Sequence, residues 1–307
     1  MACPRYDQSI TFIATLRSIC CVSGILAVVE NLAVLLACGK VHSLRSTARH
    51  FMASLAAAEL LAGFIANLYF SLILSRNESV PIKTESAIWF FTTTSVTLSL
   101  SSVALDRYIA ITSPLQYHNR MTSTRSLILI MVSWCFSLLG ATMMYVVPGE
   151  NLVEMWICSD ITSVFIPFCV ITFCYFKIYR ATKNTFPVRE NITEAQQMAE
   201  NLRQRKTANT FKIITGLFIV LYMPCFIFNC MYLFRRPDIN MIKCYSFRRN
   251  LWILIAVISY FSAVCDPWVY AIRMRDFRMA LKELLQSMCR ILHISWAGKR
   301  DGRTWLH

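Results

Sequence analysis

The stretch Ser99–Tyr117, SLSSVALDRYIAITSPLQY, ends a long apolar segment on the charged pair Asp106 and Arg107, followed by Tyr108. A charged pair at the end of an apolar helix is costly unless it lies at a membrane interface or pairs inside a helix bundle. The alternative is that Arg107 merely extends its aliphatic stem toward water. The rest of the chain bears on this choice, because it contains six more apolar segments.

The composition is that of a membrane protein. Of the 307 residues, 56% are hydrophobic and 16% are charged, whereas about 25% of the residues of soluble domains are charged. The apolar residues form runs of about 20, the length that crosses a bilayer, and no cleavable signal peptide is evident before the first run. We expect an all-α protein with spans at roughly 19–38, 50–74, 86–111, 125–147, 160–180, 210–234 and 251–272.

The distribution of charge predicts the orientation. The basic residues behind the net charge of +14 gather in alternate loops and after the seventh span, and positive loops remain cytoplasmic. We therefore expect an extracellular N-terminus in a multi-pass protein of the plasma membrane. Asn77, which begins the sequon Asn77-Glu78-Ser79, is then an extracellular glycosylation candidate. The basic residues lie in short loops between spans, which excludes nucleic acid as a partner.

The chain after the seventh span predicts an amphipathic helix on the inner leaflet. Its apolar residues repeat at three- and four-residue spacing, and its cations lie on other faces. Cys289 at its end is a palmitoylation candidate or a free thiol. We expect a single domain over 1–307, with an extracellular N-terminus (1–15), a helix bundle (16–272), the amphipathic helix (273–290) and a cytoplasmic tail (291–307).

With its seven spans and the sequence Asp106-Arg107-Tyr108 at the inner end of the third, the chain resembles the rhodopsin-like (class A) G-protein-coupled receptors. Each span carries a marker of that family: Asn31, Leu55-Ala56-Ala57-Ala58-Glu59, Asp106-Arg107-Tyr108, Trp134, Pro167 with Tyr175, Phe218 with Tyr222 and Pro224, and Asp266-Pro267-Trp268-Val269-Tyr270. The resemblance implies a seven-helix bundle that passes an extracellular signal to a heterotrimeric G protein. Arrestin, a receptor kinase and membrane lipids are the further partners that it implies.

The resemblance also implies a switch. Asp106 holds Arg107 at rest and releases it to Tyr175, Tyr270 or the G protein in the active state. Leu115 matches the apolar residue that such receptors press into a G protein. Gln204 stands where many members carry an acid that pairs with the arginine. We therefore expect a weakened resting lock and raised basal signalling.

We expect the conformational change to pass from the ligand side to the G-protein side through helices that proline residues make easier to bend. Pro167, Pro224 and Pro267 each remove a backbone hydrogen bond at mid-span. Phe218 and Tyr222 lie close to Pro224 in the sixth span, and Tyr222 stands near the place where the family usually has tryptophan. An aromatic phenol can serve as the same kind of toggle, provided that its hydroxyl finds a partner.

The polar core departs from the family pattern. Asn31 matches it, but Glu59 replaces the usual aspartate and Asp266 the usual asparagine. Two carboxyl groups in one buried pocket titrate as a unit. We expect them to share a proton rather than to hold a sodium ion well, and no other cofactor is predicted.

The cysteines indicate an altered disulfide. The family's usual bridge starts at the top of the third span, but no cysteine lies near Ile82. Cys3, Cys158 and Cys244 are the candidate extracellular thiols. They allow three pairings, of which we favour Cys3–Cys244.

The expected ligand pocket is aromatic and apolar. Trp89 occupies the position of the aspartate of biogenic-amine receptors, and Tyr260 that of the retinal-binding lysine, so neither ligand is expected. The candidate lining residues are Tyr69, Glu85, Trp89, Phe90, Thr93, Tyr222, Phe226 and Tyr260. Local motifs resemble most the group of melanocortin, adenosine, cannabinoid and lysolipid receptors. A lipid, another small molecule and a peptide remain open, and the basic outer loop between the sixth and seventh spans is either a mouth for anionic ligands or an interfacial anchor.

Three other classes of protein are alternatives to a signalling receptor. A transporter or channel would show paired repeats, broken helices or a filter, and the sequence has none of these. An enzyme would need a nucleophilic or acid–base constellation within the spans, and none appears. A constitutive or non-signalling receptor-like protein is the remaining alternative, against which the motifs around Arg107 and Pro267 argue.

Overall fold

The computed structural model describes residues 10–40, 46–69, 71, 82–113, 116–148, 152–183, 202, 213, 216–228, 230, 245–273, 277–287 and 289–290. Nearly all of these residues are helical, and none of them forms a strand. Leu115, Gln204, Cys3, Cys244 and Asn77, and the side chain of Tyr270, lie outside the described part.

The helices follow the predicted spans closely. They are α1 (Ile10–Lys40), α2 (Ser46–Leu61) continued by the π-helical η1 (Ala62–Asn67), α4 (Ile82–Thr112), α5 (Tyr117–Arg120), α6 (Ser123–Val146), α7 (Leu152–Asp160) continued by the π-helical η3 (Ile161–Phe165) and α8 (Ile166–Lys183), an apolar helix at Gly216–Phe228, α11 (Tyr245–Tyr260) and α12 (Ser262–Arg273). Five helical segments are long and apolar enough to cross a membrane, and two shorter apolar helices, Gly216–Phe228 and Leu254–Val269, match the sixth and seventh spans. The seven apolar segments bear out the predicted fold class.

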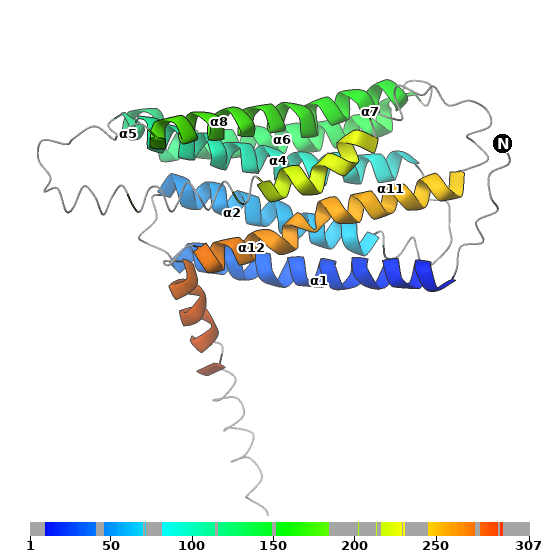
Figure 1. Ribbon diagram of the computed structural model, residues 1–307, viewed down its shortest axis with the longest axis horizontal. Helices are drawn as coiled ribbons and strands as arrows, with labels where there is room; N and C mark the ends of the chain where they lie inside the picture. Colours follow the sequence, from blue (N-terminus) through cyan, green and yellow to red (C-terminus); the bar gives the residue numbers. More distant parts are fainter. Residues whose placement is uncertain are drawn as a thin grey trace, which may run out of the picture.

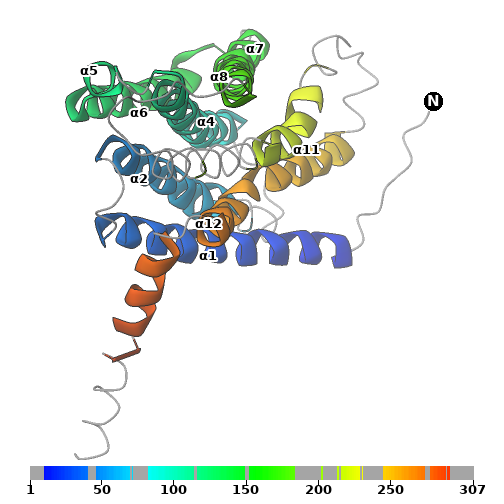
Figure 2. The same ribbon diagram turned by 60° about the vertical axis from the view of Figure 1, so that its left-hand side comes forward.

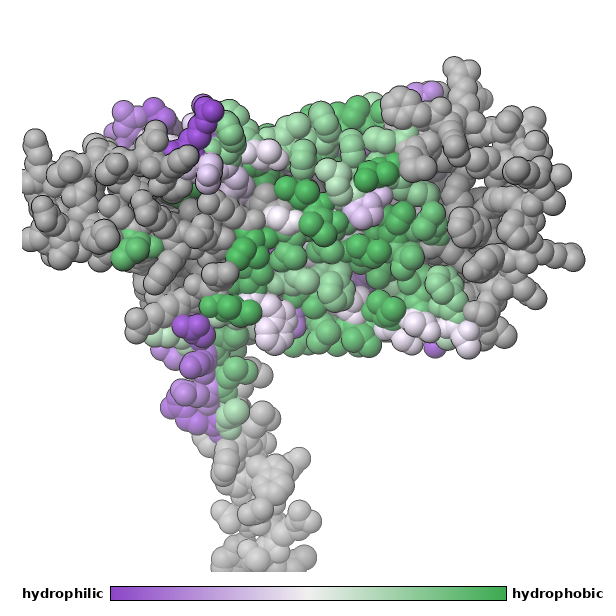
Figure 3. All heavy atoms as spheres, viewed as in Figure 1, coloured by the Kyte–Doolittle hydropathy of each residue, from purple (hydrophilic) through white to green (hydrophobic). Residues whose placement is uncertain are grey.

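The bundle is organised around α4. This helix contacts α2, α6 and α8, and α1 packs against α2 and α12 (Figures 1 and 2). Small polar side chains fill the inside of α4, where Thr92, Thr93 and Thr97 are fully buried. Large apolar side chains cover the outside instead, as on α6 with Met131 and Val132. Figure 3 shows the resulting hydrophobic belt, with hydrophilic residues toward one end. This inside-out pattern suits a bilayer, since lipid rather than water contacts the belt.

The segment 277–287 is helical and turns away from α12 (Figure 1). Phe277, Ala280 and Leu284 are buried, whereas Lys282 and Cys289 are exposed. This one-sided burial is compatible with the amphipathic helix expected there. Its place on the inner leaflet and the division of the chain into four regions stay predictions. α1 begins at Ile10, so it includes residues expected in the N-terminal region 1–15.

α1 and η1 pack at their closest through two glycines. A Cβ atom placed on Gly63 would lie 2.7 Å from the Cβ of Ala27 and 3.2 Å from the carbonyl oxygen of Gly24. Small residues at such a crossing let two membrane helices approach backbone to backbone. One of these two neighbouring atoms belongs to the main chain. A side chain at Gly63 therefore cannot be accommodated by a rotamer change and would push the two helices apart.

We expect Gly63→Ala to lower the apparent melting temperature of the purified receptor. Overpacking typically costs about 1–3 kcal/mol. Gly216→Ala is the matched control, because a Cβ atom at Gly216 meets nothing within 4 Å, and alanine is a better helix former than glycine by about 1 kcal/mol. Thermal unfolding in detergent micelles checks both variants. Equal melting temperatures for the two would contradict the close approach at Gly63.

Candidate functional site

Asp106 lies in the last turns of α4 and is bound from two sides. Its Oδ2 accepts a hydrogen bond of 2.7 Å from Nη2 of Arg107, and its Oδ1 accepts one of 2.7 Å from the hydroxyl of Tyr117. The carboxylate is 1% exposed, whereas the side chain of Arg107 is 15% exposed. The pair is therefore a partly buried lock with its cation toward the end of the helix, and not a lone arginine that reaches into water.

Tyr117 connects this lock to a second helix. The hydroxyl of Thr47, near the start of α2, lies 2.6 Å from the Tyr117 hydroxyl. Because Tyr117 donates its own proton to Asp106, the proton of this second bond comes from Thr47. The pKa of the Tyr117 phenol is raised by burial and by the negative charge of Asp106, so the phenol keeps the proton that it donates at neutral pH.

The neighbours of the lock complete this end of the bundle. Tyr175 on α8 is nearly buried, and the ring of Tyr108 lies edge-on to Phe173 with 6.1 Å between the ring centroids. The side chain of Tyr175 belongs to the same hydrophobic core as Tyr117. Leu115, Gln204 and the side chain of Tyr270, which were predicted to take part in the switch, lie outside the described residues.

Asn31 connects α1 to the seventh span by a hydrogen bond to a backbone carbonyl oxygen that has no partner within its own helix because of a proline. Pro267 has no N–H to donate to the carbonyl oxygen four residues earlier, which belongs to Ala263. Nδ2 of Asn31 donates to that oxygen at 2.8 Å and to the carbonyl oxygen of Ala27 at 3.0 Å. Two sequence markers that were predicted separately thus meet in one contact. The helix of the seventh span is interrupted nearby, at Phe261 between α11 and α12.

Glu59 and Asp266 face each other in the core between α2 and α12. Both are buried, and the two carboxyl groups come close enough to interact electrostatically. Apart from the contact between the two carboxyl groups themselves, neither oxygen of Glu59, nor Oδ1 of Asp266, has a hydrogen-bond partner in the described part of the chain. Such orphaned oxygens fit a monovalent cation or a proton shared by two acids. Glu30 lies apart from this pair, where Nε1 of Trp268 donates to its Oε1 at 2.9 Å.

The predicted transmission residues form an aromatic contact beside a loosened helix. The rings of Phe218 and Tyr222 lie with their centroids 4.7 Å apart, within the two turns that precede Pro224. The hydroxyl of Ser259 on α11 donates to the carbonyl oxygen of Leu221 at 3.1 Å, which fixes this turn to the seventh span. In the fifth span the backbone is π-helical over η3, immediately before Pro167. Single π-helical turns of this kind are frequent at functional sites.

Toward the opposite end of α4 an aromatic cluster joins the third and seventh spans. The ring of Trp89 lies edge-on to Trp252, with 4.9 Å between centroids, and to Tyr260, with 5.5 Å. The hydroxyls of Tyr260 and Thr92 are 2.7 Å apart. Tyr69 packs on the main hydrophobic core of the bundle, to which Trp89 and Tyr260 also belong.

The remaining predicted pocket residues on α4 are Glu85, Phe90 and Thr93. Glu85 is in the first turn of α4, one turn before Trp89. Phe90 belongs to a separate cluster with Met144 and packs against Gly140 of α6, where a Cβ atom would meet its ring at 1.9 Å. Thr93 is fully buried beside Thr92, on the following position of α4.

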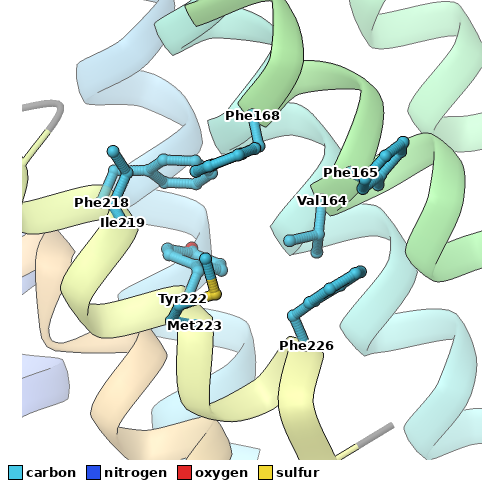
Figure 4. A pocket seen from close by; sticks show the side chains of 8 residues that line it. All are labelled: Val164, Phe165, Phe168, Phe218, Ile219, Tyr222, Met223 and Phe226. Atoms are coloured by element: carbon cyan, nitrogen blue, oxygen red, sulfur yellow. The ribbon is translucent and has the colours of Figure 1, made fainter. Parts of the chain in front are cut away.

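A cavity separates the fifth and sixth spans (Figure 4). It holds about 360 Å³, including its open mouth, and shares two residues, Tyr222 and Phe226, with the predicted ligand pocket. Its wall is formed by Val164, Phe165 and Phe168 from the fifth span and by Phe218, Ile219, Tyr222, Met223 and Phe226 from the sixth.

The sequence did not single out Tyr117, Thr47, Thr92 or Trp252. Thr47 and Thr92 are small hydroxyl residues that occur throughout these spans. Tyr117 lies within the stretch that decides the fold, 11 residues after Asp106, but its role depends on the path of the loop and not on a spacing. Of the thiols, Cys158 and Cys289 are exposed, and Cys158 forms no disulfide with another cysteine of the described residues.

Comparison with known proteins identifies relatives over most of the chain. The family model for the 7 transmembrane receptor (rhodopsin family) matches residues 30–270. The adenosine receptor A2a of Homo sapiens is 27% identical over 301 residues, which cover 86% of this chain and 70% of that receptor. The adenosine receptors A2a of Canis lupus familiaris and Equus caballus are 26% and 27% identical, with the same shares covered.

Proposed function

The chain belongs to the rhodopsin family of seven-transmembrane receptors and is a G-protein-coupled receptor, and we propose that the lock of Asp106, Arg107 and Tyr117 controls its coupling. The predicted family is confirmed, and the adenosine receptors among its relatives belong to the predicted group of melanocortin, adenosine, cannabinoid and lysolipid receptors. As a member of a family of receptors rather than enzymes, it is a protein of the plasma membrane with a heterotrimeric G protein as its partner.

The observation that supports this proposal is the pair of hydrogen bonds that Asp106 accepts, one from Arg107 and one from Tyr117. A carboxylate that is almost fully buried and accepts two short hydrogen bonds keeps Arg107 in one place. Charge-assisted hydrogen bonds of this kind are about twice as strong as neutral ones. A G protein that draws Arg107 away must replace them, so coupling and release of the lock are one event. We place this end of the bundle, with the helix 277–287, in the cytoplasm, and the N-terminus outside.

The same proposal places the ligand at the opposite end of α4. The cluster of Trp89, Trp252 and Tyr260 crosses from the third to the seventh span, with Glu85 one turn away. Its aromatic walls suit a lipid, another small apolar molecule or a hydrophobic peptide side chain. The relatives are named for adenosine, so this nucleoside belongs in the first ligand panel beside anionic lipids and peptides. Arrestin, a receptor kinase and surrounding lipids are further partners that we propose from the family.

Dissociation of G-protein subunits in cells tests the function directly. The receptor is expressed with each G-protein class in turn, without ligand, and its surface level is followed by an N-terminal epitope tag in unpermeabilised cells. We expect a signal above that of cells without receptor, carried by one class of G protein. The tag also checks the orientation, since a tag that is accessible only after permeabilisation would contradict the extracellular N-terminus.

We further propose that Glu59 and Asp266 share a proton, so that sodium ions have little effect on the receptor. The melting temperature of the wild type should be equal in sodium chloride and choline chloride. Asp266→Asn removes one carboxyl group and leaves Glu59 with a neutral oxygen donor beside it, which suits a sodium ion better. At sodium concentrations of about ten times Kd, the variant should melt roughly 3–5 °C higher in sodium. Sodium stabilisation of the wild type would contradict the shared proton.

A further inference from the structure

The cavity between the fifth and sixth spans, here called the η3 cavity, has an apolar wall. Four phenylalanines, a valine, an isoleucine and a methionine make up most of it, and Tyr222 is its one residue with a polar side-chain atom. Phe165 and Phe226 stack across it with 6.0 Å between centroids and 16° between ring planes, so that one ring from each span closes one side (Figure 4). A polar ligand would gain little here, because buried polar groups need partners.

The mouth of the η3 cavity lies in the lipid-facing belt. Phe165 is 46% exposed, and the neighbouring residues on the two spans, Ile166 and Ile227, are 48% and 52% exposed. Val164 and Phe218, in contrast, line the inner wall and are buried. The cavity is therefore continuous with the surface that contacts hydrocarbon, and an occupant can enter from the bilayer without crossing water.

The local backbone accounts for the cavity. The π-helical turn η3 contributes Val164 and Phe165, and residues on both sides of Pro224 contribute the opposite wall. A π-helical turn and a proline each alter the regular packing surface of a helix, and here they stand in the two facing walls. An apolar cavity left empty loses the dispersion contacts of its lining atoms, and in a membrane the available filler is the hydrocarbon of the lipids.

We propose that the η3 cavity is a binding site for an acyl chain of a membrane lipid. The chain enters past Phe165 and Phe226 and contacts Phe218 and Tyr222, the aromatic pair of the transmission region. The apolar wall selects hydrocarbon, and continuity with the lipid-facing belt selects the bilayer as its source. The site is distinct from the aromatic cluster around Trp89, which lies at the end of α4 and shares no lining residue with it.

Photolabelling in lipid nanodiscs tests this site. The purified full-length receptor is placed in phosphatidylcholine that carries a diazirine in one acyl chain, irradiated, digested and mapped by mass spectrometry. Ordinary contact with the belt labels exposed residues such as Val220 and Ile227, whereas an inserted chain also labels the buried Phe218. Val164→Phe fills the cavity, and Val170→Phe is the same change on the same span at an exposed position outside the cavity.

We expect label on Phe218 in the wild type and in Val170→Phe, and about tenfold less in Val164→Phe, the factor that corresponds to some ten lost dispersion contacts. Val164→Ala, which removes wall without filling the cavity, should retain the label. Label confined to exposed residues in the wild type, or equal loss in Val164→Ala and Val164→Phe, would overturn the proposal. The measurement needs no G protein, so it stands apart from the outcome of the coupling experiment.

Discussion

Arg107→Ala should reduce ligand-free G-protein activation to the background of cells without receptor, at matched surface expression. Arg107 is the cation that the resting lock holds, and in the proposed mechanism it is the group that the G protein receives. Truncating a charged side chain that a protein–protein interface buries costs about 2–5 kcal/mol of binding, so loss of the arginine that the G protein receives should lower the signal at least about 30-fold. Subunit dissociation, followed in living cells, measures this loss.

The control for Arg107→Ala is Lys282→Ala. It removes an exposed cation from the helix 277–287 without touching the lock, and it should signal as the wild type does. An undiminished signal in Arg107→Ala would contradict the coupling role of the residue. Background signal in the wild type as well would contradict the raised basal activity expected from Gln204.

The apolar segments and the end of α4 were predictable because they depend on composition and short spacing. Seven runs of bilayer length require helices, since lipid offers no partner for the backbone. The contact between Asn31 and Ala263 was half predictable. Each element of it, an asparagine in the first span and Pro267 in the seventh, was singled out, but their meeting joins residues 232 positions apart. A single sequence gives no information on which residues so far apart along the chain come into contact.

In the candidate pocket, the direction in which each side chain leaves the helix decides which residues it contacts. Adjacent residues on a helix point about 100° apart, so an error of one position changes the neighbour of a side chain completely. Phe90 follows Trp89 in sequence and yet packs on Gly140 of α6. Which faces of α4 meet which helices is set by packing of the whole bundle, and the apolar pattern of α4 is too uniform to reveal it.

Tyr117→Phe should raise ligand-free signalling, in the opposite direction to Arg107→Ala. The change removes one hydroxyl, and with it the hydrogen bond that Asp106 accepts at Oδ1 and the contact with Thr47. A hydrogen bond to a charged group contributes about 1.5–3 kcal/mol. Because that contribution stabilises the resting lock, its loss should raise the active fraction at least about tenfold while the active state remains the minor one.

Two variants show whether the gain passes through the lock. Tyr145→Phe makes the same chemical change at an exposed position of α6, remote from Asp106, and should leave signalling unchanged. Adding Arg107→Ala to Tyr117→Phe should abolish the gain, since the released arginine is what the G protein receives. Gln204→Glu, which restores the acid that many family members carry, should lower basal signalling instead.

The sign of the Tyr117→Phe effect separates two roles for this residue. If Tyr117 served only to hold the loop in place, its loss would loosen the surface that meets the G protein and signalling would fall. If it holds Asp106, and through Asp106 the arginine, signalling rises. The geometry favours the second role, because the Tyr117 hydroxyl donates directly to Oδ1 of Asp106. A fall in the Tyr117→Phe signal at matched expression would assign the residue to the loop and leave Arg107 alone to hold Asp106.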